Sequence, residues 1–415
     1  MRRARCYNMP SMNGQKLRAF LRLRWQSIIL YGGLFACAGV LQFILLGSLI
    51  SNYSSSEVAS YAAGQQVKIL GTNPFYLPFY LVEQALGKLM PSDYGVARLS
   101  AALFGFLTLI VFCIVLRAWH GRRVAILGTA LLGSSSWFLH VARLGTPDVL
   151  LFGLFIAFAC GVWLRQTESR LAVPASLAIA AVLLYVPGMV WFIALGVLWQ
   201  WRQLDRIFVR RPWLVSLGAL LLAAIVTPLA WAIYHSHNLY KTFLGLPAQG
   251  WPKPLTALEH FAKVPFHIFV WPNASPEVWL GKVPMLDIAA TAFLCFGVYY
   301  YFRARLLARA KVLLTIFVVG GALVSLGGEA STSMFVPFLY LLVAAGVGFL
   351  LEKWFVVFPR NPIAKNLAVW LVGIVVGATC TYNIRAYFIA WPQASATQAY
   401  FQEVPIHAAP KSMAN

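Results

Sequence analysis

Apolar residues in this chain gather into long stretches that shorter charged segments separate. A helix needs about 20 predominantly apolar residues to cross the hydrocarbon core of a bilayer, which is about 30 Å thick. Eleven stretches approach this length, so the pattern predicts an all-α polytopic membrane protein with about 11 transmembrane helices. The predicted spans lie at 27–50, 96–116, 122–141, 148–164, 172–186, 188–201, 213–234, 284–302, 311–327, 331–351 and 366–389.

The segment 172–201 is the ambiguous part of this pattern. As a single helix it would be about 45 Å long, at about 1.5 Å per residue, far longer than the hydrocarbon core. As two helices it turns at Tyr185-Val186-Pro187-Gly188, a sequence typical of a helix end. The hairpin also keeps the basic segments 202–212 and 303–311 on the same side as the other basic loops. We therefore predict the hairpin.

Charged residues alternate between the two sets of loops. Of the 33 Lys and Arg, 23 fall in the N-terminal arm and in every second loop, whereas nine of the 12 acids lie in or beside the other loops. This is the positive-inside pattern, which predicts an inner (plasma) membrane protein with a cytoplasmic N-terminus and an acid-bearing outer face. The basic segments are 1–26, 117–123, 165–170, 202–212, 303–311 and 352–365.

The predicted organisation has three parts. They are a cytoplasmic basic arm at 1–26, a transmembrane domain at 27–390 and a short outer C-terminal tail at 391–415. Two outer loops, 51–95 and 235–283, are too long to be simple connections. In the first loop we predict two amphipathic helices lying on the membrane interface, at 56–70 and 75–90, because aromatic, proline and charged residues are mixed there.

The composition excludes an ordinary soluble domain. Hydrophobic residues make up 60% of the chain and charged residues 11%, and the mean hydropathy is +0.73, whereas about a quarter of the residues in soluble domains are charged. The net charge of +21 could indicate a nucleic-acid partner. However, the basic residues flank apolar spans, so we assign them to topology and to contacts with anionic membrane lipids, and we predict no nucleic-acid partner.

Several motifs of well-known enzyme classes are absent from the sequence. It has no GxxxxGK[ST] phosphate loop, no GxGxxG after a strand and no HExxH, and its seven His do not cluster at ligand spacing. ATP-driven, dinucleotide-dependent and zincin chemistry are therefore unsupported. The acids of the predicted outer face are the remaining candidates for chemistry.

Glu57 follows the first predicted span by seven residues and has two interpretations. Ser54-x-x-Glu57 has the spacing of a capping box, in which the acid only begins a helix. Alternatively, a carboxylate at the membrane surface can act as a general base. The same predicted helix would present Tyr61 and Lys68 at helical spacing.

Asp148 opens the fourth predicted span directly after Pro147. Its structural interpretation is an acid that complements the helix dipole. Functionally, Arg143 lies five residues earlier and could bind a phosphate near it, although an interfacial Arg can also snorkel. We interpret Arg98 as an interfacial anchor, and Glu329 most simply as a solvated acid in a short outer turn.

Five short segments occur in an order that resembles the membrane glycosyltransferases of the GT-C type. The likeness is to the bacterial relatives of protein mannosyltransferases and of the aminoarabinose transferase that acts on lipid A. It covers most of the chain and is strongest over 50–200. The segments are Ser56-Glu57, Asn73-Pro74-Phe75-Tyr76, 97–105, 142–148 and Pro337-Phe338-Leu339-Tyr340.

The resemblance implies inverting transfer of a sugar from a polyprenyl-phosphate carrier to an acceptor hydroxyl or amine outside the cytoplasm. The acceptor would be a lipid, a glycan or a protein. The resemblance gives the role of catalytic base to Glu57 and places Arg143 and Asp148 at the donor site. Nucleotide sugars are cytoplasmic, and the chain has no large inner domain to receive one, which agrees with a lipid-linked donor.

The predicted site therefore has three groups of residues. They are Glu57 and Asp148 as catalytic residues; Arg143, Lys68 and Lys241 at the donor phosphate; and Tyr61, Asn73, Tyr76 and Glu329 around the acceptor. The metal requirement stays open: no cofactor is certain, and a divalent cation is an alternative.

Two other classes of protein remain as alternatives. A membrane transporter or lipid flippase without catalysis would be expected to show inverted repeats and charged or broken helices at mid-membrane. In this sequence mid-span charges are nearly absent and the acids gather at one side, which favours the enzyme. In a structural or assembly subunit, the outer acids would be helix caps only. Within the enzyme class, a polymerase or ligase of surface glycans would use similar lipid donors.

Overall fold

The computed structural model describes residues 14–50, 52–67, 73–89, 95–166, 169, 171–236, 238–247, 251–270, 285–303 and 308–401. Over this part of the chain the secondary structure is helical, with no strand. In chain order the helices are α1 (Gly14–Phe43), α2 (Ser55–Gln66), α3 (Leu77–Leu89), α4 (Gly95–His120), α5 (Arg122–Ser134), α6 (Ser136–Arg143), η1 (Pro147–Phe152), α7 (Gly153–Gln166), α8 (Ala172–Leu183), α9 (Met189–Arg210), α10 (Pro212–His235), α11 (Leu239–Phe243), α12 (Pro254–Phe269), α13 (Ile288–Arg303), α14 (Ala308–Ser325), η2 (Thr332–Phe335), α15 (Val336–Val357), α16 (Pro362–Arg385), η3 (Ala386–Ala390), α17 (Trp391–Gln393) and α18 (Ser395–Tyr400).

Each predicted span contains a helix, and the all-α polytopic fold class is confirmed. Among the described residues, seven helices are long and apolar enough to cross a membrane, or eight if the bent pair α5 and α6 counts as one span. Two more apolar helices, α8 and α13, are shorter. The structure therefore does not confirm the count of 11 spans.

The predicted span 122–141 is not one straight helix. It is bent by 60° at Ser135, where α5 ends and α6 begins. The Ser135 hydroxyl accepts a hydrogen bond from the Phe138 N–H at 3.4 Å, and Asn383 Oδ1 accepts one from the Ser136 N–H at 3.2 Å. These side chains satisfy donors that the break releases, and so the bend is stable inside the bundle.

The first predicted span, 27–50, is displaced towards the N-terminus. Its helix, α1, already begins at Gly14 and ends at Phe43. The chain leaves the helix at Leu45, whose φ of 54° lies in the left-handed region. The last carbonyls of this segment accept hydrogen bonds from Arg143 and Arg98 instead of from the next helical turn.

The predicted hairpin within 172–201 is present. Helices α8 and α9 are joined by a turn in which Gly188 has a φ of 77°, a conformation that favours glycine. The turn is held by the Gly188 N–H, which donates to Phe243 O at 3.1 Å. The Tyr185 hydroxyl also donates to Ile225 O, at 2.6 Å.

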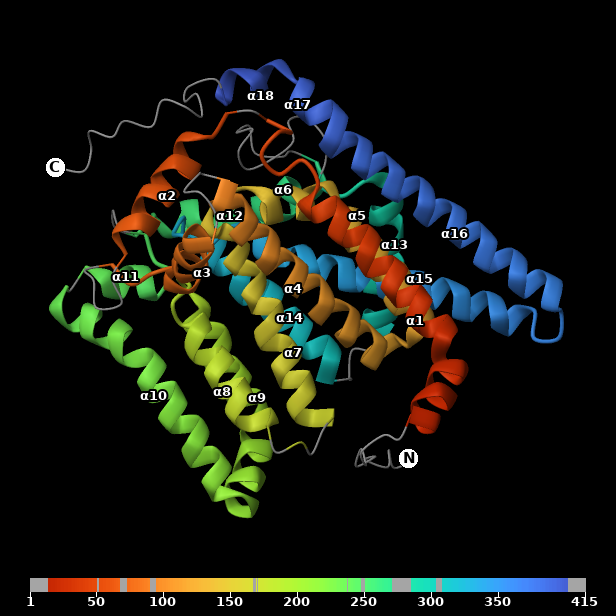
Figure 1. The fold of residues 1–415 in the computed structure, drawn as a ribbon, viewed down its shortest axis with the longest axis horizontal. Helices are drawn as coiled ribbons and strands as arrows, with labels where there is room; N and C mark the ends of the chain where they lie inside the picture. The colour runs from red at the N-terminus through yellow and green to blue at the C-terminus, as the bar shows by residue number, and fades with distance from the viewer. Residues whose placement is uncertain are drawn as a thin grey trace.

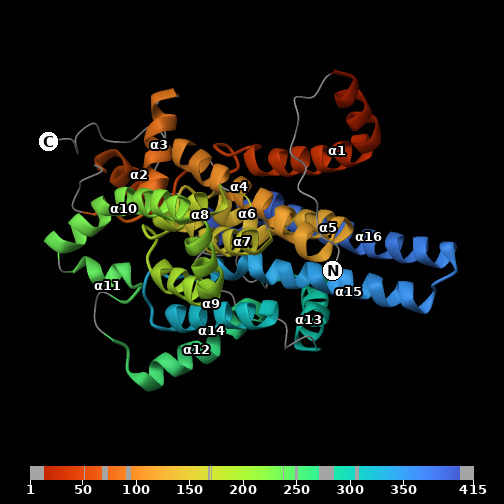
Figure 2. The ribbon, with the colours of Figure 1, turned by 90° about the horizontal axis from the view of Figure 1, so that it is seen from below.

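Helix α15 is the centre of the bundle. In the most apolar part of the span Thr332–Val357, which includes α15, 83% of the residues are buried, against 11% in the corresponding part of α1. Helix α15 therefore packs on protein, whereas α1 lies at the edge. Figures 1 and 2 show α2, α3 and α11 at one end of the molecule and the link between α15 and α16 at the other. The link between α9 and α10 lies at the lower edge of Figure 1, away from α2 and α3.

The first predicted outer loop contains two helices, α2 and α3, and α2 ends at Gln66 rather than at residue 70. Their position on the membrane interface stays a prediction. At the other end of the chain, the helical structure continues past η3 into α17 and α18, and Trp391 and Phe401 are buried. The first residues of the predicted tail therefore pack on the bundle.

Candidate functional site

Glu57 lies in the first turn of α2 and is 1% exposed. The predicted capping box is confirmed: the Ser54 hydroxyl accepts from the Glu57 N–H at 3.2 Å, and Glu57 Oε2 accepts from the Ser54 N–H at 3.0 Å. Two donors at the start of α2 are satisfied in this way.

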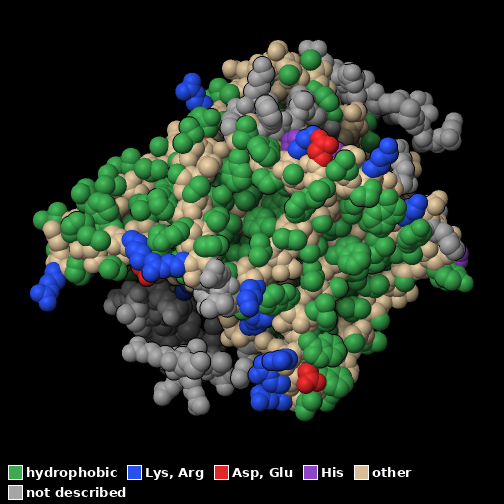
Figure 3. All heavy atoms as spheres, turned by 180° about the vertical axis from the view of Figure 1, so that it is seen from behind, with side chains coloured by type: hydrophobic (Ala, Val, Ile, Leu, Met, Phe, Trp, Pro, Cys, Tyr) green, Lys and Arg blue, Asp and Glu red, His purple; other side chains and the backbone are tan. Residues whose placement is uncertain are grey.

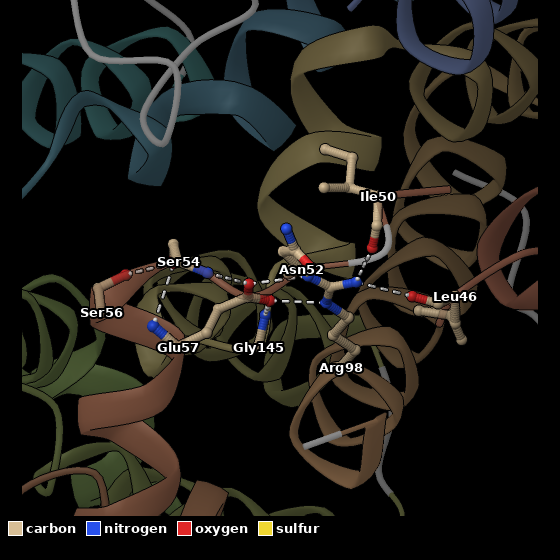
Figure 4. Close-up of polar contacts among 8 residues, drawn as sticks. All are labelled: Leu46, Ile50, Asn52, Ser54, Ser56, Glu57, Arg98 and Gly145. Carbon is tan, nitrogen blue, oxygen red and sulfur yellow. Dashed lines mark hydrogen bonds and ion pairs between the residues drawn. The ribbon is translucent and has the colours of Figure 1, made fainter. Parts of the chain in front are cut away.

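The same carboxylate forms a bidentate ion pair with Arg98 (Figure 4). Arg98 Nε lies 2.7 Å from Glu57 Oε1, and Nη2 donates to Oε2 at 2.9 Å. Arg98 comes from the first turn of α4 and is 5% exposed, so the prediction of an interfacial anchor is wrong. A buried guanidinium needs a paired and hydrogen-bonded partner, which Glu57 supplies.

The other Arg98 donors bind the segment between α1 and α2. Nη1 donates to Leu46 O at 3.2 Å and to Ile50 O at 3.1 Å, and Nη2 donates to Asn52 O at 3.0 Å. The guanidinium also lies 4.2 Å from the centre of the Tyr53 ring. Arg98 therefore fixes the path of the backbone where it leaves α1.

Glu57 also binds the segment that leads to Asp148. Its Oε1 accepts a hydrogen bond from the Gly145 N–H at 2.8 Å. A Cβ on Gly145 would lie 3.2 Å from that oxygen and 3.3 Å from the Arg98 backbone nitrogen, so only glycine approaches so closely without a shift. Asp148 follows three residues later, in the first turn of η1. One carboxylate thus ties together α2, α4 and the start of η1.

Three of the predicted site residues, Tyr76, Asp148 and Glu329, come together outside this ion pair. The Tyr76 hydroxyl donates to Glu329 Oε2 at 3.5 Å. Burial, followed by the negative charges of Glu329 and Asp148, raises the pKa of the Tyr76 phenol above its usual value. Both acids are exposed, so a proton can exchange between either carboxylate and a bound molecule.

Loops from distant parts of the chain converge around Tyr76. Tyr76 has a φ of 59°, a left-handed conformation that is rare for a bulky residue, and its N–H donates to Tyr185 O at 3.0 Å. A Cβ on Gly328 would lie 2.2 Å from Gly245 O, which brings the turn bearing Glu329 against the loop after α11. Backbone strain of this kind is concentrated at functional sites.

Arg143 lies in the last turn of α6 and is buried. Its guanidinium donates to Leu41 O and, at 2.6 Å, to Ile44 O. It also lies over the rings of Tyr387 and Phe388, at 5.5 and 4.9 Å from their centres. These contacts connect α6 to the end of α1 and to η3, and the role of Arg143 at a donor phosphate stays a prediction.

The other predicted residues that the structure describes lie on α11, on α2 and in the turn before α3. Lys241 is half-buried on α11, whose Leu239 and Phe243 pack against the cluster that includes Tyr76. Tyr61 is half-buried on α2. Asn73 Oδ1 accepts from the Phe75 N–H at 3.2 Å and forms a turn before α3. Lys68 lies outside the described residues.

Glu83 is a candidate that the sequence did not indicate. It lies on α3, is 1% exposed, and neither of its carboxylate oxygens has a hydrogen-bond partner in the described part of the chain. The carboxylate packs against Gly64 of α2, where a Cβ would lie 2.9 Å from Oε2. Burial raises the pKa of Glu83 to about 8. In sequence it is one acid of an amphipathic helix, with no local signal of burial.

Metal ligands do not converge in the described part of the chain. Among the residues placed there, no three His, Cys, Asp or Glu side chains lie close enough together to hold an ion. The divalent cation therefore stays an alternative. The Glu57–Arg98 ion pair and the cluster of Tyr76, Asp148 and Glu329 are candidate sites for chemistry.

No protein-family model matches the chain, and no curated protein matches it either. Solved structures do match. ArnT from Cupriavidus metallidurans bound to undecaprenyl phosphate aligns with 89% of this chain and 77% of its own, at 16% sequence identity and a TM-score of 0.56. The same protein in the apo state aligns with 89% of this chain and 76% of its own, at 16% identity and a TM-score of 0.55.

The similarity extends over nearly all of the membrane domain, although few residues are shared. The order of motifs from Glu57 to Tyr340 had predicted a GT-C-like fold, and the structure agrees with that prediction. The chain is an all-α, multi-pass membrane protein with an ArnT-like fold.

Proposed function

We propose that this protein is an inner-membrane glycosyltransferase that moves a sugar, with inversion, from a polyprenyl-phosphate donor to an acceptor outside the cytoplasm. The observation that carries the proposal is the fold, which is similar to that of a protein solved with undecaprenyl phosphate bound. The cluster of Tyr76, Asp148 and Glu329 supports it, because exposed acids meet there at the end of the bundle predicted to face outward.

The reaction sets two requirements for the site. The acceptor oxygen or nitrogen bonds to the anomeric carbon while the bond from that carbon to the phosphate oxygen breaks. The acceptor proton goes to a base, and the charge on the leaving phosphate is stabilised by a cation. Lys241 lies on α11, whose Leu239 and Phe243 pack against the same hydrophobic cluster as Tyr76, and we propose it for the phosphate.

Two carboxylates compete for the role of base. Glu57, the base implied by the family resemblance, accepts hydrogen bonds from Arg98, Gly145 and Ser54, so it can take a proton only after Arg98 releases it. Asp148 is exposed, so an acceptor can reach its carboxylate from solvent. We propose Asp148 as the base in the observed geometry. The Glu57–Arg98 pair would then position the segment that carries it.

The test is sugar transfer from a synthetic polyprenyl-phosphate donor by purified wild type, Asp148→Asn, Glu57→Gln and Ser54→Ala, with donor binding measured separately. Losing a general base lowers turnover by about 10²–10⁴-fold. Asp148→Asn should show this loss while it still binds donor. Ser54→Ala should stay active, because it removes only a capping hydroxyl.

The outcomes distinguish Glu57 from Asp148 as the base, and they distinguish a glycosyltransferase from a transporter. If Glu57→Gln is folded, binds donor and is inactive while Asp148→Asn turns over normally, the base is Glu57. If the wild type binds the donor and moves it across a reconstituted bilayer but transfers no sugar to any lipid, glycan or peptide acceptor, the transporter alternative replaces the proposal.

A further inference from the structure

A second candidate site lies at the opposite end of α7 from Asp148. Asp148 precedes α7, and Arg165 lies in the last turn of α7, 17 residues later. That separation corresponds to about 25 Å of helix at about 1.5 Å per residue. Nothing in the proposed transfer reaction uses this region, so an inference about it is independent of the proposed function.

An apolar cavity of about 190 Å³ lies there between α7, α8, α9 and α14. Its walls are mainly aliphatic and aromatic, with contributions from Phe158, Leu177, Ile193 and Ile316. Apolar walls of this kind favour contact with hydrocarbon over contact with water. In a membrane protein, the hydrocarbon at hand is a lipid chain.

A cationic pocket of about 380 Å³ adjoins this cavity. The two spaces share Leu164, Arg165 and Val173 in their walls. Four arginines line the cationic pocket, and no acid is found among its described lining residues. The four are Arg165, Arg206, Arg210 and Arg211.

Three of the four arginines, Arg165, Arg206 and Arg210, retain capacity to bind an anion. Arg165 uses one N–H of its guanidinium on Trp199 O at 3.1 Å, and Arg206 uses one on Arg202 O at 3.1 Å, whereas a guanidinium carries five. No described residue accepts a hydrogen bond from the Arg210 side chain. Like charges gathered in one pocket repel one another, and a phosphate would convert that repulsion into attraction.

We propose that the two spaces form one binding site for an anionic phospholipid, with the phosphate among the arginines and an acyl chain in the apolar cavity. A free phosphate would use only the cationic half. Basic pockets between helices on the cytoplasmic side are a recurrent site for anionic head groups. Figure 3 shows Lys and Arg gathered at the lower edge, where α9 meets α10, with an acidic side chain beside them and a mainly hydrophobic face above.

The experiment measures equilibrium binding of a chain-labelled phosphatidylglycerol to the full-length protein in neutral detergent. Binding should saturate. Unlabelled phosphatidylglycerol should displace the probe at least tenfold better than phosphatidylcholine does, and millimolar inorganic phosphate should not displace it. Arg206→Gln/Arg210→Gln should weaken binding by tenfold or more, because each basic residue near an anionic lipid contributes about fivefold.

Matched controls separate a site from general surface charge. Lys353→Gln/Arg360→Gln removes the same charge near the link between α15 and α16, and it should leave the affinity unchanged. Equal weakening by both pairs would overturn the proposal.

The apolar half is tested by Gly196→Leu, because Gly196 lines the cavity and a Cβ there meets nothing within 4 Å. The added side chain should block the acyl chain and weaken binding by several-fold. Gly377→Leu on α16 has the same open surroundings and is its control. If Gly196→Leu binds phosphatidylglycerol like the wild type, or if inorganic phosphate displaces the probe, the lipid site is refuted.

Discussion

At the scale of single residues, Glu57 and Arg98 determine how the first outer loop is held. Replacing Arg98 by Gln leaves a buried carboxylate without its charge partner, which costs about 3–5 kcal/mol. Ser54→Ala removes one capping hydrogen bond and costs about 0.5–2 kcal/mol. Unfolding in detergent, monitored by circular dichroism, should therefore show that Arg98→Gln is much less stable than Ser54→Ala.

The ion pair also predicts that the stability losses of its two single variants are not additive. In Glu57→Gln/Arg98→Gln neither charge is left alone, so the double variant should be more stable than the sum of the two single losses predicts. Equal stability of Arg98→Gln and Ser54→Ala, or strict additivity, would show that the pair is not a buried ionic unit.

Glu83 predicts a pH dependence of stability. Its pKa is about 8 in the folded protein, against an ordinary value of 4.5, so the folded state holds the proton more tightly. The resulting stabilisation is complete below about pH 4.5 and is lost as the pH rises through about 8. The Tm of the wild type should decrease as the pH rises from 5 to 8.5. In Glu83→Gln this pH dependence of the Tm should be smaller by the contribution of Glu83.

The control for this prediction is Glu259→Gln. Glu259 is an exposed acid, paired with Lys263 at 2.6 Å. The hydrogen bond and ion pair with Lys263 lower the pKa of Glu259, so this residue stays charged where Glu83 is expected to titrate. A slope that persists unchanged in Glu83→Gln would show that Glu83 is charged in the folded protein.

The sequence revealed only part of these residue roles. The capping box at Ser54 and Glu57 is a local pattern, so spacing was enough to find it. Arg98 lies 41 residues beyond Glu57, and Gly145 lies 88 residues beyond it. Their shared carboxylate depends on how the helices pack, which no local pattern encodes.

At the scale of helices, α13 and α15 approach each other most closely through glycines. A Cβ on Gly346 would lie 1.9 Å from Phe293 O, and one on Gly297 would lie 1.9 Å from Leu342 O. Small residues let two membrane helices bring their backbones together. Gly346→Ala should therefore separate the pair and lower stability by about 1–3 kcal/mol.

Gly377→Ala is the matched control, because a Cβ there meets nothing within 4 Å. It should be as stable as the wild type or slightly more stable, since alanine favours a helix over glycine. Thermal unfolding of the two variants in the same detergent compares them. If Gly346→Ala unfolds at the temperature of Gly377→Ala, the close approach does not contribute to the packing of α15.

Hydrophobic patterning predicted where helices occur better than where they end. The spans and the turn at Gly188 follow from local composition, and the structure places helices there. The break at Ser135 depends on Asn383, which lies 247 residues from Ser136. Likewise, α1 ends where Arg98 and Arg143 bind its carbonyls. Contacts with residues that are distant in the sequence therefore determine where these helices end.

At the scale of the whole molecule, the charge pattern predicts which loops face the cytoplasm. Single Cys probes within 202–212 and 308–311, in a Cys-free protein, should be shielded from an impermeant thiol reagent in intact cells. Probes within 238–247 should react. Labelling of 202–212 from outside would reverse the orientation of the segments that follow the α8–α9 turn.

The overall fold was predictable because several weak signals agreed. Span order, charge alternation and the sequence of short motifs each indicated the same class, and the ArnT-like fold confirms it. The arrangement of the site was less predictable. Tyr76, Asp148 and Glu329 meet only because loops after different helices converge, and their separation in the chain hides this.

The contacts of the Glu57 carboxylate with Arg98 and Gly145 also have a consequence for biogenesis. Its carboxylate needs Arg98 and then Gly145, the second of which is made 88 residues after it. At about 5–20 residues per second, that interval is on the order of 10 s of synthesis. The first outer loop therefore gains all of these contacts only after synthesis has passed Gly145, and a chain missing one early insertion would carry an unmatched charge.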